Sequence, residues 1–505
     1  MASFDYTYNR ASQWVEVRRE DHSLWRYEYD RLGQVIFGGK FAPNAGTGEL
    51  EAIPGHGFNY GFDDIGNRRQ STRLDTPFNS SGPAVGARSD YSVNLLNQYE
   101  ERTVPAIADL IGETDPRADL LVRAENENGG SIPTDIERAG AQFRASAKVD
   151  NRLSAVTTTF EAEATLDGSS NTRSAAVTTP TSPVTYSHDP DGNLIQDESW
   201  HYVWNGENRL VAMFSHQNVA PEKRKRLDFT YDYQGRRIEK VVSDWEKKRE
   251  EYRITNRVGY FYDSWNLISE ISEKDKDAHR KNYLWGLDLS HSPQGAGGIG
   301  GLLSIRPERT DSKKGKNQQD LIQQIPFYDG RGNIVGLASG ESGELTAHYT
   351  YGPFGELLSS TGPESFNNLF RYSSKYTDIE SGLSYFGYRY YGPLTGRWFS
   401  RDPIEEEGGK NLFQYCYNNS VDLYDPDGRL VPAIVCVVIA GATLCGCGGP
   451  PPLSPEEAAE EIAQRARDKF AQLVSGGTWN DAVAACAYVS NTTMGNRGHV
   501  STFDK

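Results

Sequence analysis

The chain has 505 residues, of which 37% are hydrophobic, and it contains 28 Tyr, 20 Phe, 9 Trp and 50 Gly beside only 3 Met. Aromatic side chains suit a pleated surface and glycine suits the turns between strands, so this composition predicts a mainly β fold. The formal net charge of −16 argues against nucleic-acid binding by the β part of the chain, because phosphate backbones attract cations.

The first residues, MASFDYTYNRASQWVEVRRE, lack the cationic stretch and apolar core of a conventional signal peptide. If the protein is exported, we expect another route. The cysteines all come late, and their spacing does not match the paired ligands of a structural zinc site. We therefore predict no disulfide framework before them, no metal site and no cofactor; the cysteines are Cys416, Cys436, Cys445, Cys447 and Cys486.

Residues 1–103, residues 185–326 and the start of the region that follows at 327 repeat one short phrase: an aromatic residue, Asp, two further residues, Gly, and then a polar and an apolar residue. The Asp carboxylate can accept backbone N–H groups two residues on, and the Gly can adopt a positive φ, which together make a tight turn. Each phrase therefore predicts a hairpin tip. Because one hairpin alone is only marginally stable, we expect the hairpins to stack into an extended antiparallel sheet. The phrases lie at 27–37, 60–69, 186–195, 231–242, 261–271 and 327–337.

Residues 104–184 lack this phrase and are rich in Ala and Thr, as in AGAQFRASAKVDNRLSAVTTTFEAEATLDGSS. We interpret them as a small inserted β module that ends in a Ser/Thr/Pro linker. The repeats resume after it.

Residues 327–428 contain an ordered series of motifs: PFYDGRGNIVGL, YTYGPFGELL, FRYSSKYTDIESGLSYFGYRYYGPLTGRWFSRDPIEEEGGKNLFQY and YNNSVDLYDPDG. Together with the repeats, this series resembles the rearrangement-hotspot (Rhs) proteins and their Rhs-associated core. The resemblance implies an antiparallel YD-repeat sheet that spirals into a shell-like cocoon, which in many relatives encloses a C-terminal toxin. Within this core, Gly332 and Gly396 are expected at turns.

Two aspartates near the end of this region each precede a proline: Asp402 in SRDPIEEEGG and Asp425 in LYDPDGRL. Asp before Pro commonly starts a turn, whereas two carboxylates brought together share a proton and can activate water, as in an aspartyl protease. Spacing alone leaves both interpretations open. The resemblance implies the second, because autoproteolytic Rhs proteins carry their catalytic aspartates in these two motifs, with Gly428 as the motif glycine. They cut after the last motif residue, so the implied cut is the Arg429–Leu430 bond.

The chain departs from the family pattern at the cut itself, where Arg429 replaces Leu, and also at Phe413 in place of Tyr and Ser420 in place of Pro. A charged side chain beside the cut must be accommodated in a site that is shaped for an apolar one. Cleavage therefore depends on what surrounds Arg429.

Residues 429–505 differ in composition from the repeats and stand where relatives carry a variable effector tip. The apolar segment 430–447 is just long enough to cross a bilayer as a helix, and it is equally suited to fold inside the shell. A helix is predicted at about 454–474, with Ser454 as its N-cap and Pro455 as its first residue.

The sequence thus predicts an Rhs-type polymorphic-toxin carrier whose only enzymatic activity is self-cleavage. Its expected partners are a delivery machinery and a cognate immunity protein, and its expected location is secreted or at the cell surface, with membrane association through 430–447. Two alternatives stay open. One is a cell-surface module whose Tyr and Trp side chains bind glycans or proteins without proteolysis, and the other is a truncated remnant without activity.

Overall fold

The computed structural model describes residues 3–44, 46–75, 86–274, 277–309 and 322–429. From Tyr6 onward these residues belong to one compact unit. The described ranges contain no α-helix, and nearly all of their regular structure is antiparallel β. The predicted mainly β fold with extended antiparallel sheets is therefore confirmed.

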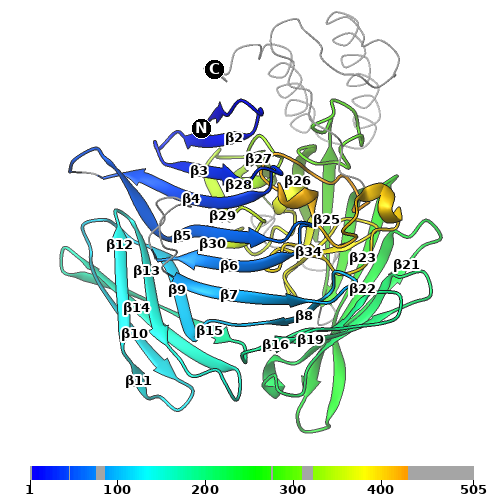
Figure 1. The fold of residues 1–505 in the computed structure, drawn as a ribbon, viewed down its shortest axis with the longest axis horizontal. Coiled ribbons are helices and arrows are strands. Elements are labelled where there is room, and N and C mark those ends of the chain that lie inside the picture. Colours follow the sequence, from blue (N-terminus) through cyan, green and yellow to red (C-terminus); the bar gives the residue numbers. More distant parts are fainter. Residues whose placement is uncertain (1–2, 45, 76–85, 275–276, 310–321, 430–505) are drawn as a thin grey trace, which may run out of the picture. The chain divides into compact units, whose positions relative to one another are not determined.

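The first repeats form a nine-stranded sheet in which neighbouring strands also follow one another in the chain, except at its last strand (Figure 1). This order follows from the tight tips, because a strand that turns back at once pairs with the strand before it. The strands, in sheet order, are β1 (Phe4–Tyr8), β2 (Trp14–Arg19), β3 (Leu24–Tyr29), β4 (Val35–Pro43), β5 (Leu50–Phe62), β6 (Arg68–Leu74), β7 (Gly86–Val93), β8 (Tyr99–Arg102) and β16 (Val184–Thr185).

The later repeats form a fourteen-stranded sheet, again in chain order. A short 3-10 helix, η1 (Pro221–Lys223), lies in the connection between β20 and β21, which pair with each other. The strands are β17 (Ser187–His188), β18 (Leu194–Gln196), β19 (Trp200–Trp204), β20 (Leu210–Ser215), β21 (Lys225–Tyr231), β22 (Arg237–Glu246), β23 (Glu251–Asp263), β24 (Asn266–Lys274), β25 (Asp277–Trp285), β26 (Leu302–Arg309), β27 (Gln324–Tyr328), β28 (Ile334–Ser339), β29 (Leu345–Tyr351) and β30 (Leu357–Thr361).

A small two-sheet module is inserted between β8 and β16, which pair with each other across the insertion. One sheet has the order β11-β10-β14-β15 and the other β12-β13-β9. Small side chains and two phenylalanines, Phe143 and Phe160, fill the core between them. The strands are β9 (Ile107–Glu113), β10 (Asp119–Asn126), β11 (Ser131–Ile132), β12 (Thr134–Ala139), β13 (Gln142–Lys148), β14 (Val156–Leu166) and β15 (Ser169–Thr179).

The hairpin tips have the turn chemistry that the sequence indicates. In five of the six phrases, the Asp carboxylate accepts the backbone N–H four residues on at 2.7 to 3.0 Å. The glycine three residues after that Asp has a φ between +70° and +87°. At the sixth phrase Ser264 takes the positive φ instead, and Asp263 pairs with Asn266 across the turn.

The tyrosine before a tip has a second role, which the sequence does not reveal. Its ring packs inside, and its hydroxyl donates to a main-chain carbonyl of the preceding hairpin at 2.6 to 2.8 Å. A buried tyrosine hydroxyl needs such an acceptor, so these bonds tie one hairpin to the next. The pairs are Tyr29 with Trp14, Tyr231 with Leu210, Tyr262 with Arg237 and Tyr351 with Ile334.

The core segment, residues 362–429, is the last described part of the chain and packs against both large sheets. Figure 1 shows it in yellow and orange, between the blue strands and the green strands. Its Tyr385 and Phe399 share one hydrophobic core with β7, β8 and β19 to β22, and its Phe370 shares another with β23 to β29. Its elements are η3 (Tyr372–Ser374), the four-stranded sheet β31 (Tyr376–Asp378), β32 (Leu383–Tyr385), β33 (Tyr390–Gly392) and β34 (Arg397–Trp398), η4 (Glu405–Gly408) and η5 (Cys416–Asn418).

A buried charge cluster fixes this segment to the fourteen-stranded sheet. Arg237 and Lys240 of β22 both pair with Asp378 of β31, at 2.6 and 2.9 Å, and Lys240 also pairs with Glu380 at 3.0 Å. The Arg237 guanidinium also lies over the ring of Tyr385, 4.7 Å from its centroid. Buried ions require this degree of pairing, because an unpaired charge inside a protein is very costly.

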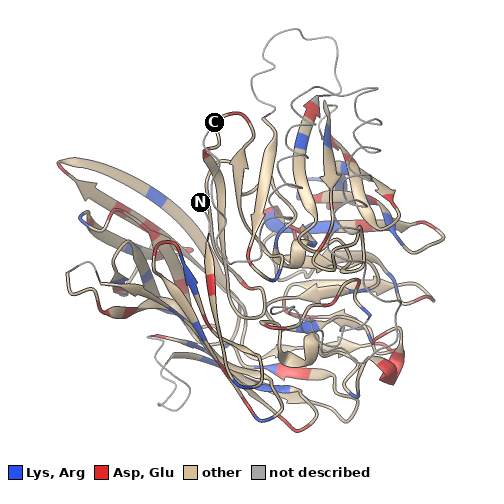
Figure 2. Ribbon diagram, turned by 90° about the horizontal axis from the view of Figure 1, so that it is seen from above, with Lys and Arg blue, Asp and Glu red and all other residues tan. Residues whose placement is uncertain are grey.

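Lys and Arg are interspersed with Asp and Glu over the strands (Figure 2). In the described ranges, no helix is long and apolar enough to span a membrane, and no cluster of three or more His, Cys, Asp or Glu is arranged to hold a metal ion. The predicted apolar segment 430–447, the predicted helix 454–474 and Leu430 lie outside the described residues.

Candidate functional site around Asp402 and Asp425

The two Asp-Pro aspartates lie in the core segment after its small sheet. Asp402 follows β34 and precedes η4, whereas Asp425 follows η5 near the end of the described chain. Both are buried, with exposed fractions of 8% and 1%. Neither aspartate lies in a strand, so sheet pairing does not fix its position. Side-chain contacts with Arg389 fix both carboxylates instead.

Arg389 brings the two aspartates together. Its Nη2 atom lies 2.7 Å from Oδ2 of Asp402 and 3.5 Å from Oδ2 of Asp425. Its Nη1 atom donates to the carbonyl of Leu412 at 3.2 Å, and its Nε atom donates to the carbonyl of Gly428. The fork of one guanidinium thus joins both acids to the loop that precedes the predicted cut.

The Asp425 carboxylate also shapes the loop that follows it. Its Oδ1 atom accepts the backbone N–H groups of Asp427, Gly428 and Arg429 at 3.1, 2.7 and 3.2 Å. Gly428 has a φ of +88°, which favours glycine. One oxygen of Asp425 therefore holds the backbone up to Arg429, while the other faces Arg389.

Electrostatics keep a proton available at this site. Burial raises the pKa of Asp425 to about 6, and the positive charge of Arg389 only partly opposes this. Burial also raises the pKa of Asp402, again against Arg389. A single guanidinium balances only one carboxylate, so the pair favours a state with one carboxylate and one carboxylic acid.

Gly408 lies between Asp402 and the backbone of Arg429. A Cβ atom on Gly408 would be 2.6 Å from Oδ2 of Asp402 and 3.3 Å from the carbonyl oxygen of Arg429. The Asp402 carboxyl and the carbonyl of the predicted scissile bond therefore both lie close to this glycine. Any larger side chain would occupy the space between them.

A buried lysine holds the loop from the other side. The Nζ atom of Lys375 donates to the carbonyls of Pro426 and Gly297, at 2.5 and 2.8 Å. A Cβ atom on Gly297 would lie 1.8 Å from the Pro426 oxygen, so only glycine fits there. Burial lowers the pKa of Lys375 to about 8, although Asp427 and Asp425 oppose this.

Arg429 is accommodated by charge rather than by an apolar pocket. Its Nη2 and Nε atoms lie 2.7 and 3.0 Å from Oδ2 of Asp427. Its guanidinium also lies 3.9 Å from the centroid of the Tyr388 ring. The departure of this chain from the family pattern at Arg429 is thus matched by partners of the right chemistry.

The other two glycines that the sequence singles out also have positive φ angles, +70° at Gly332 and +65° at Gly396. A side chain at either would clash, at Gly332 with Ile299 and at Gly396 with Arg68. Both glycines lie in turns that contact other parts of the unit.

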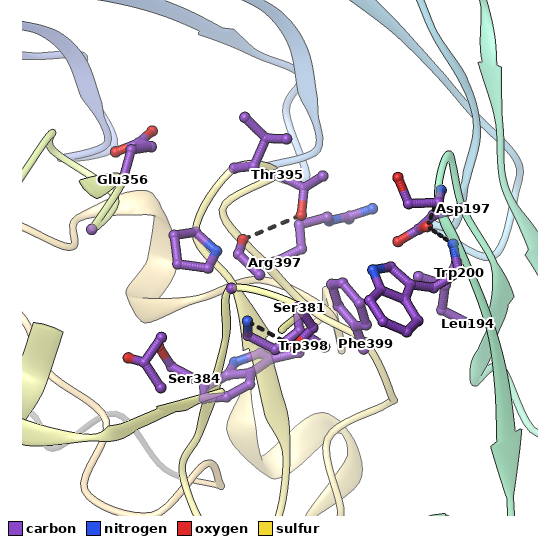
Figure 3. Close-up of a pocket in the computed structure, with 18 of the residues that line it drawn as sticks. Leu194, Asp197, Trp200, Glu356, Ser381, Ser384, Thr395, Arg397, Trp398 and Phe399 are labelled. Carbon is purple, nitrogen blue, oxygen red and sulfur yellow. Dashed lines mark hydrogen bonds between the residues drawn. The ribbon is translucent and has the colours of Figure 1, made fainter. Parts of the chain in front are cut away.

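A cavity of about 400 Å³ lies elsewhere in the unit and is not lined by Asp402 or Asp425. Figure 3 shows Leu194 and Trp200 from the region of β18 and β19 on one side, and Arg397 and Phe399 from the core segment. A mixed aromatic and polar lining is typical of small-molecule sites. Glycan binding stays a prediction, and this cavity is one place to test it.

Sequence reasoning finds the two aspartates but misses Arg389, Gly408, Lys375 and Tyr388. The only signal for Arg389 is its position as a lone charge within the aromatic stretch SYFGYRYYG. A charge among residues that otherwise suit a core is a candidate for a paired, buried ion. Gly408 is one of several glycines, and nothing in the sequence separates it from the others.

No protein-family model matches the chain. The chain is 30% identical over 281 residues to the tRNA3(Ser)-specific nuclease WapA of Bacillus spizizenii, which covers 53% of this chain and 10% of WapA. It is also 32% identical over 203 residues to the putative uncharacterized protein YibJ of Escherichia coli K12. This match covers 37% of this chain and 85% of YibJ. The crystal structure of TcdB2-TccC3-Cdc42 matches 85% of this chain and 19% of that chain, with a TM-score of 0.40 and 17% identity.

Hairpins with a Tyr-Asp-Gly tip, stacked in chain order, define a YD-repeat protein. The chain belongs to the family of YibJ, since it covers most of that protein at this identity. Its relatives include Tc toxin subunits, Tse5 and WapA nucleases, which are Rhs/YD-repeat toxin proteins. The resemblance to this class is confirmed, whereas the specific Rhs-associated core stays a prediction. The chain spans only about a tenth of the length of the WapA relatives that it matches.

Proposed function

We propose that this chain is the carrier part of an Rhs-type toxin and releases the residues after 429 by cutting its own Arg429–Leu430 bond. The observation that carries this proposal is the pairing of Asp402 and Asp425 with one nitrogen of Arg389, next to the residue before the bond. Relatives among the Tc toxin subunits and nuclease toxins support the carrier role.

The chemistry needs only the two acids and water. Asp402, beside the Arg429 carbonyl oxygen, donates the shared proton to that oxygen, while Asp425 accepts a proton from water. The water oxygen adds to the carbonyl carbon, and the resulting adduct breaks its bond to the nitrogen of Leu430. That nitrogen takes up the proton that left the water, and the hydroxyl formed from the carbonyl oxygen returns its proton to Asp402 as the C=O bond forms again. The products are a carboxyl group at Arg429 and an amine at Leu430, so the reaction consumes no cofactor.

Intact-mass spectrometry of the purified full chain tests this reaction. Wild-type protein should yield a fragment that ends at Arg429, and Asp425→Asn should stay whole because Asn cannot take the proton. Asp191→Asn is a control for the loss of a carboxylate, because Asp191 lies in the other DPDG sequence of the chain, at an exposed hairpin tip. Samples must be kept neutral, since Asp-Pro bonds also break in acid. A wild-type chain that stays whole, or an Asp425→Asn chain that is cut equally, contradicts the proposal.

Within this proposal, residues 430–505 are the effector tip, and their partners are a delivery machinery and an immunity protein. In this proposal, membrane association occurs through 430–447, and the location is secreted or at the cell surface. Bacteria that express the full chain should grow more slowly than bacteria that express residues 1–429. Equal growth of the two would favour an inactive remnant.

A further inference from the structure

The residue before the predicted cut, Arg429, is held by two neighbouring side chains, those of Asp427 and Tyr388. Asp427 bonds to two nitrogens of the Arg429 guanidinium through one carboxylate oxygen, at 2.7 and 3.0 Å. Tyr388 presents the face of its ring to the same guanidinium at 3.9 Å. Charge-assisted hydrogen bonds and cation–π contacts both select a cation over an apolar side chain.

Tyr388 is itself fixed in place. Its ring lies 4.8 Å from that of Trp265, and its backbone N–H donates to the carbonyl of Asp427 at 3.0 Å. Tyr388 also directly precedes Arg389, the residue that joins the two aspartates. The receptor for the Arg429 side chain and the proposed catalytic centre are therefore built on the same short stretch of backbone.

We propose that Asp427 and Tyr388 form a recognition site for a basic residue before the cut, so that this chain cleaves after Arg where the family pattern has Leu. The inference rests on the proposed self-cleavage and states which residue type the reaction selects before the cut. Asp427 and Tyr388 act as positioning residues: they fix the side chain of Arg429 and with it the carbonyl that lies beside Gly408 and Asp402.

The contact with Asp427 also balances the positive charge of Arg429, which interacts with Asp425. An unpaired cation beside the two acids would favour the state in which both carboxylates are ionised and would remove the shared proton that the reaction needs. Pairing within the loop neutralises Arg429 locally. A lysine at this position should satisfy the same requirement in part, because it carries the charge without the planar fork.

The test compares self-cleavage rates of full-length variants after dilution from denaturant, followed by gel and intact mass. Arg429→Leu and Asp427→Asn should each slow cleavage by about tenfold to a hundredfold, the range expected for hydrogen bonds to a charged group. Arg429→Lys should retain more activity than Arg429→Leu. The charge-exchanged double variant Asp427→Arg with Arg429→Asp should recover part of the loss of Arg429→Asp alone.

Asp191→Asn serves again as the matched control for Asp427→Asn, and thermal unfolding checks that each variant folds. If wild type is cut but Arg429→Leu is cut as fast, the recognition site is wrong while self-cleavage stands. If wild type itself is not cut, self-cleavage fails and the recognition site fails with it. A loss in Asp427→Asn without any difference between Arg429→Lys and Arg429→Leu would indicate a purely structural role for Asp427 and overturn the inference.

Discussion

The Nη2 atom of Arg389 lies 2.7 Å from Oδ2 of Asp402, and the same nitrogen contacts Asp425. This is the contact that turns two separate Asp-Pro turns into one site. Arg389 is only 2% exposed, and its guanidinium stacks 4.2 Å from the ring centroid of Trp398. Its position is therefore fixed by packing as well as by charge.

Arg389→Lys should slow self-cleavage by about tenfold to a hundredfold, because Lys cannot reproduce the fork to both acids and to Gly428. The cleaved fraction over time, measured by gel after refolding, reports the rate. Arg226→Lys is the control, since Arg226 forms a half-exposed pair with Asp228 far from the site in the sequence. Unchanged cleavage in Arg389→Lys would mean that Arg389 does not position the acids.

Gly408→Ala should abolish most cleavage while leaving the fold intact. The added methyl group would lie 2.6 Å from Asp402 Oδ2, which forces the carboxyl away from the carbonyl of Arg429, and a shift of about 1 Å can cost a hundredfold in rate. Gly206→Ala is the control, because nothing lies within 4 Å of a Cβ there. Wild-type cleavage in Gly408→Ala would rule out the proposed approach of Asp402.

The self-cleavage rate should fall as the pH rises through about 6. Burial raises the pKa of Asp425 to about 6, so above this pH the two acids lose the proton that they share, and Asp402 then has no proton to donate to the carbonyl oxygen of Arg429. The decline should approach tenfold per pH unit well above 6. Refolding wild type at a series of pH values gives the profile, with Asp402→Asn as the uncut reference. A rate that rises between pH 6 and 8 would contradict this assignment.

Asp378→Asn should destabilise the unit by about 3 to 5 kcal/mol, because it leaves Arg237 and Lys240 buried without their shared partner. The exposed fractions of the Asp378 and Arg237 side chains are both 1%. Urea unfolding followed by Trp fluorescence measures the change. Asp228→Asn breaks a half-exposed pair and should shift stability by less than about 0.5 kcal/mol. Similar shifts in both variants would show that the cluster does not fix the core segment.

The hairpin tips are readable from sequence because each depends on neighbours in the chain. The Asp30 carboxylate and Gly33 lie three residues apart, and their turn forms with little help from the rest of the fold. The same holds for the tip at Asp189 and Gly192. Local chemistry of this kind predicts the strands and their order, and hence most of the fold.

The two DPDG sequences show where local reasoning ends. At residues 189–192 the glycine N–H donates to the main-chain carbonyl of Asp189 in a hairpin tip. At residues 425–428 the glycine N–H donates to the side chain of Asp425 instead, and no strand follows in the described chain. Identical residues thus take different roles, because one sequence has a strand partner and the other has Arg389 and Lys375.

The sequence by itself determined the β class, the hairpin tips, the Rhs resemblance and the two candidate acids, since each rests on residues close together in the chain. Only the tertiary structure decided that Asp402 and Asp425 meet, that Arg389 joins them, and that Asp427 and Tyr388 receive Arg429. Those contacts depend on how the core segment packs against two sheets. Packing of this kind is set by the summed burial of many side chains, and no short motif records it.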